Sequence, residues 1–258
     1  MIRTTVEALS LSPKPTATAW QWLVNRRLIP GARGMLSVQT LSRGATVPAH
    51  RVPAAESVTF VLSGRTDWNT GGQVWTLIPG EGVFNPPGTR RAFHAARDEG
   101  AVLLTVYGGT ADPRGASPRT ADGVTGCGCR IQHLADRGNS PLGSAGGFID
   151  MGVHWLATTQ TVGTRAVVVA TSTFTPGGSH QLHRHPHADE FFLVLEGGGE
   201  HLTRRGSLRL NPGDLAYIPA GEWHGFRTDP GVTTRTVYGY LGAGCLDQAG
   251  YELLEEDR

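Results

Sequence analysis

Residues 177–198, GGSHQLHRHPHADEFFLVLEGG, decide the fold. Four of the ten histidines in the chain fall within the eight residues from 180 to 187. His183 and His185 are separated by one residue, so on a strand their side chains would point to the same face. The apolar run EFFLVLEG follows and predicts a buried strand that begins at Glu190. Imidazoles and a carboxylate directed at one centre from neighbouring strands would form a metal site.

The glycines around this stretch belong to an internal repeat. Four glycines reappear after a displacement of 133 positions: Gly44, Gly64, Gly80 and Gly88 correspond to Gly177, Gly197, Gly213 and Gly221. The segment PGEGVFNPPGTRRAF matches PGDLAYIPAGEWHGF, and TVYGG matches TVYGY. The 36 glycines and 16 prolines separate short segments rich in Val, Leu, Phe and Thr, which favours many short strands. The sequence therefore predicts an all-β chain made of two tandem units.

The repeat also predicts the organisation of the 258 residues. We expect an N-terminal arm at 1–30, a first β unit at 31–110, a linker at 111–152, a second unit at 153–244 and a C-terminal tail at 245–258. The linker is rich in Gly, Ser, Pro and Arg. The segments AWQWLVNRR and LDQAGYELLEEDR are candidates for short helices or extended arms that cover an open edge or face of a barrel.

The second unit resembles a cupin domain. The motif G-x5-H-x-H-x4-E-x6-G is met by Gly177, His183, His185, Glu190 and Gly197, and the motif G-x5-P-x-G-x2-H is met by Gly213, Pro219, Gly221 and His224. The asparagine expected four residues after the last histidine is Thr228 instead. Together with the repeat, the resemblance implies a bicupin, in which two tandem jelly-roll barrels form one chain.

The resemblance implies that His183, His185, Glu190 and His224 bind one divalent transition metal. We favour Fe(II), although three imidazoles and a carboxylate also suit Mn(II), Ni(II), Co(II) or Zn(II). His180 and His187 flank the motif without belonging to it. His187 has two open interpretations, as a replacement ligand or base beside the metal, or as a solvent-exposed side chain.

The first unit departs from the motif at its ligands. We place His50 and Glu56 at the positions of His183 and Glu190, with Val52 and Arg91 in place of the other two histidines. Valine has no lone pair to offer a metal. The guanidinium of arginine is a cation that has only hydrogen-bond donors and no lone pair for a metal. We therefore predict one metal per chain and a first barrel that is a scaffold or a regulatory half. Arg91 would either pair with Glu56 inside the barrel or point outward into solvent.

The resemblance implies an enzyme that acts on a small molecule. Our main prediction is a dioxygenase-type oxidoreductase with substrate chelated at the metal and O2 as co-substrate. The alternatives are a non-oxidative isomerase, hydrolase or lyase similar to a decarboxylase or an aminohydrolase, and a non-catalytic cupin that binds a small ligand. Candidate pocket residues are Gln181, Tyr217 and Trp223, together with Phe192 and Phe226, although such aromatic residues also suit an ordinary barrel core.

Composition argues against several other classes of function. The 23 Lys and Arg residues balance 22 Asp and Glu residues without a basic block, so we expect no nucleic-acid partner. No apolar run approaches the length of a membrane span, and the first residues lack the apolar core of a signal peptide. We expect a cytoplasmic protein without a membrane partner. Exposed barrel edges favour a homodimer.

The three cysteines, an odd number, argue against a disulfide framework. Cys127 and Cys129 could form half of a zinc site, but no second pair lies nearby in the sequence. The alternative is a pair of unpaired thiols in the linker.

Overall fold

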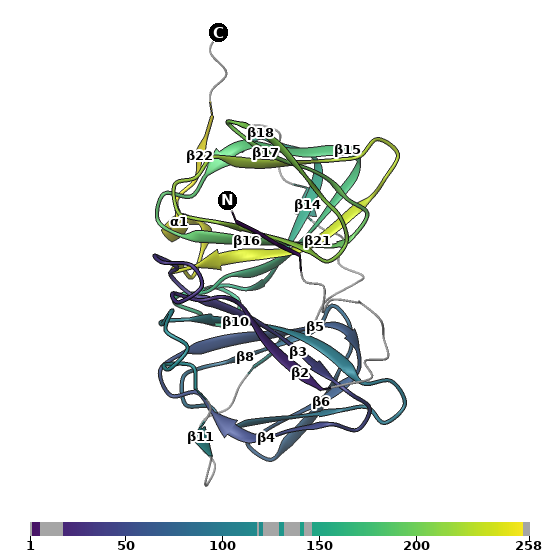
Figure 1. Cartoon of the computed structure of the whole chain (residues 1–258), viewed down its shortest axis with the longest axis vertical. Helices are drawn as coiled ribbons and strands as arrows, with labels where there is room; N and C mark the ends of the chain where they lie inside the picture. Colours follow the sequence, from purple (N-terminus) through teal and green to yellow (C-terminus); the bar gives the residue numbers. More distant parts are fainter. Residues whose placement is uncertain are drawn as a thin grey trace.

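The computed structural model describes residues 2–5, 18–117, 119–120, 129–131, 140–141 and 146–254. Within this part of the chain two β-barrels are stacked along the long axis of the molecule, the first drawn in blue and teal and the second in green and yellow (Figure 1). The regular secondary structure of the described residues is nearly all strand, with a single short helix. The prediction of an all-β chain with two tandem barrels is confirmed.

Two sheets form the first barrel. The six-stranded sheet has the order β12-β8-β5-β10-β3-β2 and contains β2 (Ala19–Val24), β3 (Met35–Leu41), β5 (Glu56–Gly64), β8 (Gly82–Asn85), β10 (Ala101–Gly108) and β12 (Cys129–Ile131). The five-stranded sheet has the order β11-β4-β9-β6-β7 and contains β4 (Thr46–Arg51), β6 (Thr66–Thr70), β7 (Gln73–Leu77), β9 (Arg91–Ala95) and β11 (Arg119–Thr120).

The second barrel is a single 11-stranded sheet, with the main order β1-β19-β16-β21-β15-β20-β17-β18. Its strands are β1 (Ile2–Thr5), β13 (Ser140–Pro141), β14 (Phe148–Ala157), β15 (Val169–Arg184), β16 (Asp189–Glu196), β17 (Gly199–Thr203), β18 (Gly206–Leu210), β19 (Asp214–Ile218), β20 (His224–Thr228), β21 (Thr234–Leu241) and β22 (Glu252–Leu253). Helix α1 (Leu246–Ala249) precedes β22. The C-terminal segment that we assigned to a tail thus adds a strand to this barrel.

The two barrels share one hydrophobic core. Strand β5 is buried along its whole length, and β16 along most of it, which fits their near-continuous apolar sequences. Phe60 of β5 and Phe191 and Leu193 of β16 belong to the same cluster of buried side chains. The prediction that the barrels pack against each other within one chain is therefore confirmed.

The contact between the barrels is reciprocal. Strand β1 precedes the first barrel in the chain but pairs with β19 of the second. Asp189 accepts a hydrogen bond of 2.7 Å from the backbone N–H of Arg33. Glu56 accepts hydrogen bonds of 3.0 and 2.7 Å from the N–H groups of Arg165 and Ala166. Each barrel therefore gives a buried carboxylate to a backbone segment of the other.

This arrangement corrects the position that we assigned to Glu56. Glu56 lies opposite Gly108 in the first barrel, and Asp189 lies opposite Leu241 at the equivalent place in the second. Glu56 is thus the counterpart of Asp189, and Ser57 is the counterpart of Glu190. Because neighbouring side chains on a strand point to opposite faces, a difference of one residue directs Glu56 to the other barrel and not to its own interior.

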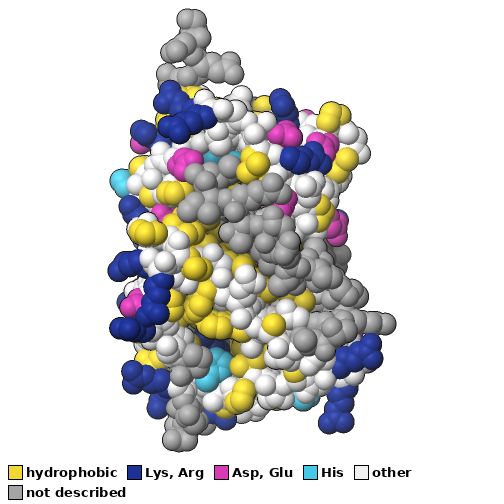
Figure 2. All heavy atoms as spheres, in the orientation of Figure 1, with side chains coloured by type: hydrophobic (Ala, Val, Ile, Leu, Met, Phe, Trp, Pro, Cys, Tyr) yellow, Lys and Arg dark blue, Asp and Glu magenta, His cyan; other side chains and the backbone are white. Residues whose placement is uncertain are grey.

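Further sequence predictions can be placed on the structure. The segment AWQWLV is the strand β2, paired with β3, as expected for an extended arm. Cys127 lies outside the described residues, and of Cys129 only its place in β12 is described, so the interpretation of this pair stays untested. No helix within the described ranges is long and apolar enough to span a membrane. On the face drawn in Figure 2, Lys and Arg lie mainly at the periphery, and hydrophobic side chains gather nearer the centre.

Candidate metal centre

Three neighbouring segments of the second barrel bring the candidate ligands together. His183 lies near the end of β15, opposite His224 at the start of β20, and Glu190 lies on β16. His185 follows β15, and its carbonyl accepts a 2.8 Å hydrogen bond from the N–H of Gly221. Gly221 has a φ of 78°, which glycine adopts without strain. The Pro-x-Gly turn is thereby fixed to the end of β15, which places His224 beside the other histidines.

The four side chains form a compact and buried group. One ligand atom from each of His183, His185, Glu190 and His224 lies within 4.8 Å of the others. None of these residues is more than 5% exposed. The Oε2 atom of Glu190 lies 3.0 Å from Nε2 of His224 and 3.2 Å from Nε2 of His185.

Backbone carbonyls fix the tautomer of each histidine. The Nδ1 atoms of His183, His185 and His224 lie 2.8, 2.6 and 2.9 Å from carbonyl oxygens of Gln181, Gly250 and Glu222. A carbonyl oxygen only accepts, so each Nδ1 carries a proton, and in the neutral ring each Nε2 presents a lone pair. Nε2 of His185 has no hydrogen-bond partner among the described residues. A divalent metal would satisfy these lone pairs, and the donor set fits such an ion.

Electrostatics in the group favour a neutral His183 and an ionised Glu190. Burial lowers the pKa of His183 well below its usual value. Burial opposes ionisation of Glu190, but His224 and His185 hold its pKa well below the usual range. Burial also acts against the protonated form of His224, but Glu190 raises the pKa of this histidine above its ordinary value. A metal would therefore displace a proton mainly from His224.

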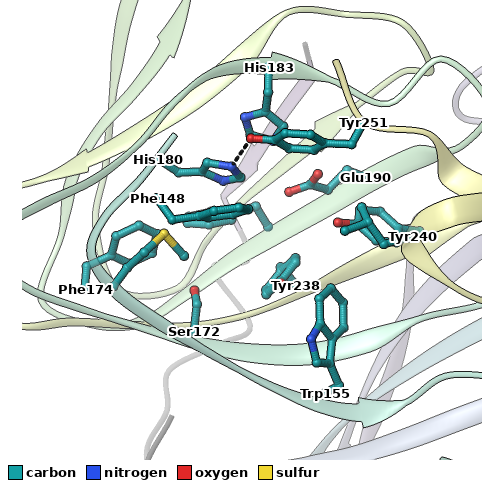
Figure 3. Close-up of a pocket in the computed structure, with 13 residues that line it drawn as sticks. Phe148, Trp155, Ser172, Phe174, His180, His183, Glu190, Tyr238, Tyr240 and Tyr251 are labelled. Carbon is teal, nitrogen blue, oxygen red and sulfur yellow. Dashed lines mark hydrogen bonds between the residues drawn. The ribbon is translucent and has the colours of Figure 1, made fainter. Parts of the chain in front are cut away.

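A small apolar cavity of about 90 Å³ adjoins His183 and Glu190 (Figure 3). The residues around it are Phe148, Met151, Trp155, Ser172, Phe174, His180, His183, Glu190, Phe192, Tyr238, Tyr240, Leu246 and Tyr251. No Lys or Arg is among these lining residues. Drug-sized ligands occupy pockets of roughly 300–1,000 Å³, so this cavity fits a much smaller molecule.

His180 is part of the cavity wall. Its ring stacks on His183 and Phe148 with centroid distances of 3.7 and 4.3 Å. Its Nε2 atom lies 3.0 Å from the hydroxyl oxygen of Tyr251, which itself donates to the carbonyl of Gly146. The hydroxyl proton of Tyr251 is already donated to this carbonyl, so Nε2 of His180 must carry a proton and donate it to the hydroxyl oxygen. Burial lowers the pKa of His180 to about 3, so the ring is neutral at working pH.

The predicted pocket residues occupy different places. Phe192 lines the cavity, and the ring of Phe226 packs against the ring of Phe192 with 5.0 Å between their centroids. Gln181, Tyr217 and Trp223 are not among the residues that line this cavity, and their predicted role in catalysis stays a prediction.

Each of these three residues has another environment. Gln181 is exposed, although its carbonyl accepts from His183. The hydroxyl of Tyr217 donates to Asp189 at 2.7 Å in the core between the barrels. Trp223 is half-buried beneath the guanidinium of Arg184, at 4.8 Å. His187, the last residue left open, is exposed.

Sequence analysis missed the part of the cavity that lies outside the motifs. Phe148, Met151 and Trp155 come from β14, of which residues 148–152 precede the predicted start of the second unit. Leu246 and Tyr251 come from the C-terminal segment, which also supplies the carbonyl that fixes His185. The aromatic residues of FIDMGVHW and of GYELL were the available signal.

Within the part of the chain that the structure describes, the first barrel has no comparable group. His50, Val52, Ser57 and Arg91 occupy the positions of the four candidate ligands. Among the described residues, the only cluster of His, Cys, Asp and Glu suited to a metal is the one in the second barrel. Arg91 is buried and contacts His50, so it neither pairs with Glu56 nor points into solvent.

Comparisons with known proteins agree with this architecture. The oxalate decarboxylase of Bacillus subtilis has a similar structure, with a TM-score of 0.66, 13% sequence identity, and coverage of 93% of this chain and 76% of that one. A cupin barrel-domain protein from Leptotrichia buccalis gives a TM-score of 0.59 at 13% identity, covering 93% of this chain and 96% of that one. No curated protein matches the chain. At such identities the likeness concerns the fold alone.

The family model for the cupin domain matches twice, at residues 37–107 and 170–235, which together exceed half of the chain. The first match covers β3 to most of β10, and the second covers β15 to the start of β21. The protein therefore belongs to the cupin family and carries two cupin domains in tandem.

Proposed function

We propose that this protein is a metal-dependent enzyme of the lyase type, which acts without O2 on a small organic monocarboxylate with a short apolar body. The observation that carries the proposal is the buried group of His183, His185, Glu190 and His224 at the wall of a small apolar cavity. Structural zinc sites are usually closed and rich in cysteine, whereas this donor set adjoins space for a substrate.

Charge balance supports a singly charged substrate. A divalent ion held by three neutral histidines and ionised Glu190 leaves a net charge of +1 in the site. One carboxylate neutralises this charge. A dicarboxylate would leave an excess negative charge, and the cavity lining has no Lys or Arg to offset it. The fold neighbour is named an oxalate decarboxylase, but this cavity does not suit oxalate.

The metal would supply Lewis-acid stabilisation of negative charge that develops on the substrate. The protein residues would orient the substrate and donate hydrogen bonds. Burial raises the pKa of Tyr238 and Tyr240 well above the usual value, so both hydroxyls stay protonated. Figure 3 shows the Tyr240 hydroxyl directed towards the side of the cavity where Glu190 lies. Tyr240 Oη is therefore suited to donate to a substrate oxygen.

The C-terminal segment would exclude water from the reaction. Leu246 and Tyr251 form part of the cavity wall, and β22 pairs with β15 so that Leu253 lies opposite His183. An apolar and enclosed site strengthens electrostatic interactions and stabilises a charged intermediate only where donors are fixed. The hydroxyl of Tyr240, which lines the cavity and stays protonated, would be such a donor.

The dioxygenase of our main sequence prediction remains a second candidate, because the same ligand set and a dry cavity also suit O2 activation. The comparisons do not favour it, and they do not favour Fe(II). The B. subtilis decarboxylase is described as holding Mn(II) centres, which makes Mn(II) an equally good candidate here.

Turnover under argon tests the proposal. Protein purified without added metal is analysed for its elements and then assayed for CO2 release and product formation with short aliphatic, aromatic and α-keto monocarboxylates. We expect turnover of one or more of them without O2, no turnover of oxalate, and loss of activity in His183→Ala but not in His94→Ala. Turnover that requires O2 and consumes it stoichiometrically would contradict the lyase assignment and favour the dioxygenase.

A further inference from the structure

The first barrel contains a second cavity at the place equivalent to the candidate metal centre. Its volume is about 430 Å³, compared with about 90 Å³ in the second barrel. The strand registers explain the difference, because Thr59 and Thr105 face each other where Phe192 and Tyr238 face each other in the second barrel. Small side chains on the same inner wall leave space that the aromatic rings fill in the other barrel.

A buried arginine lines this cavity. Arg91 is 2% exposed, and its Nη1 atom has no hydrogen-bond partner among the described residues. Its Nε atom lies 3.3 Å from Nε2 of His50, whose Nδ1 lies 2.8 Å from the carbonyl of Pro48. The carbonyl makes Nδ1 the protonated nitrogen, so Nε2 of His50 accepts from Arg91. His50 therefore orients the guanidinium without neutralising it.

No described carboxylate neutralises Arg91. Glu56, the acidic residue that the sequence placed nearest, binds the backbone of Arg165 and Ala166 in the other barrel. Burial of an unpaired charge is costly, and proteins usually pair such a group with an anion. Burial also lowers the pKa of Arg91 below its usual value, in keeping with an unpaired cation.

The remaining lining selects the class of anion. Gln39, Thr59 and Thr105 offer polar groups, and the two threonine hydroxyls lie 3.1 Å apart. Most of the other lining is apolar, including Val47, Ala49 and Phe93. Exposed Arg119 lies at the same cavity and would attract anions towards it. One buried guanidinium balances one negative charge, so a monocarboxylate with an apolar body fits better than a phosphate dianion.

We propose that the first barrel binds a small organic monocarboxylate, whose carboxylate group is held by the guanidinium of Arg91 inside this cavity. The site is separate from the metal centre and does not depend on the reaction at that centre. It gives the first barrel a binding role in addition to its structural one.

Calorimetric titration with acetate, benzoate and phenylacetate, and with neutral benzamide, tests the proposal. The His183→Ala variant is titrated beside the wild type, because carboxylates that bind at the metal centre would otherwise obscure the result. We expect one or more of the carboxylates to bind both proteins and benzamide to bind neither. Arg91→Gln should weaken this binding about 10-fold or more, since a charge-assisted hydrogen bond is lost. Exposed Arg97→Gln is the matched control and should bind as the wild type does.

A crystallographic measurement covers the case in which Arg91→Gln does not fold. Crystals of the wild-type protein are soaked in 4-bromobenzoate, and the bromine is located by its anomalous signal. A bromine site in the cavity beside Arg91 supports the proposal. The proposal is overturned if bromine is found only in the second barrel or nowhere, if none of the three carboxylates binds His183→Ala, or if Arg91→Gln binds them unchanged.

Discussion

Glu56 and Glu190 provide a test that separates the structural carboxylate from the metal ligand. Glu56 is 6% exposed and accepts hydrogen bonds from two backbone N–H groups of the second barrel. Replacement by alanine leaves both donors without their charged acceptor. At about 1.5 kcal/mol for each bond to a charged group, Glu56→Ala should lower the free energy of unfolding by about 3 kcal/mol. For a chain of this size, the melting temperature should fall by about 6–12 °C.

The same substitution should leave the metal site intact, because Glu56 points away from the interior of its own barrel. We therefore expect Glu56→Ala to retain the full metal content, while Glu190→Ala loses most of it. Urea unfolding and elemental analysis of both variants provide the two measurements, with exposed Asp98→Ala as a control for both. The reasoning is refuted if Glu56→Ala loses metal, or if its free energy of unfolding stays within about 0.5 kcal/mol of the wild type.

Three further predictions follow from the site and the barrel wall. His180→Phe should keep the metal but raise KM or lower kcat, because His180 is a wall residue whose Nε2 is bound to Tyr251; loss of metal by elemental analysis would make it a ligand. Metal-free protein should lose stability as the pH falls from 7 towards 5, because burial lowers the pKa of His180 and His201 to about 3, whereas histidines in the unfolded chain protonate near 6.5. The free energy of unfolding should fall by roughly 1.4 kcal/mol per pH unit for each net proton that the unfolded chain takes up. The raised pKa of His224 opposes this loss for one proton, and a urea midpoint that rises at low pH would contradict the prediction. Gly239→Ala should unfold the protein or make it insoluble, because the new Cβ would lie 1.8 Å from the carbonyl oxygen of Val168. In the control Gly231→Ala the new Cβ meets nothing within 4 Å, so thermal melting should show a loss of only about 1–2 kcal/mol in the free energy of unfolding, due to the positive φ.

The sequence predicts the two barrels and the grouping of four ligands because both depend on local, repeated spacing. Glycine turns fix the strand ends, and alternate positions along β15 and at the start of β16 determine which side chains face inward. The same logic, applied strictly through the displacement of 133 positions, would have matched Glu56 to Asp189 and avoided the wrong equivalence with Glu190. The error arose because Glu56 was matched to Glu190 by residue type, and not to Asp189 by its position in the repeat.

The rest of the candidate site depends on contacts between distant segments. Phe148 and Tyr251 reach the cavity because β14 and β22 both pair with β15, which no local pattern indicates. Tyr217 lies on a buried strand, and the sequence alone allows its side chain to face either the interior of its own barrel or the other barrel. Only the pairing of the strands shows that it faces the other barrel. The buried environment of Arg91 also follows from tertiary structure, because the sequence does not reveal that Glu56 is bound to the other barrel.

The metal-to-protein ratio of the purified protein shows whether the second barrel alone holds a metal. Elemental analysis of the wild type should give a value near one, which His183→Ala abolishes and His50→Ala leaves unchanged. A value near two that either substitution halves would contradict the account, as would a value near zero in protein that is folded and was never exposed to chelator.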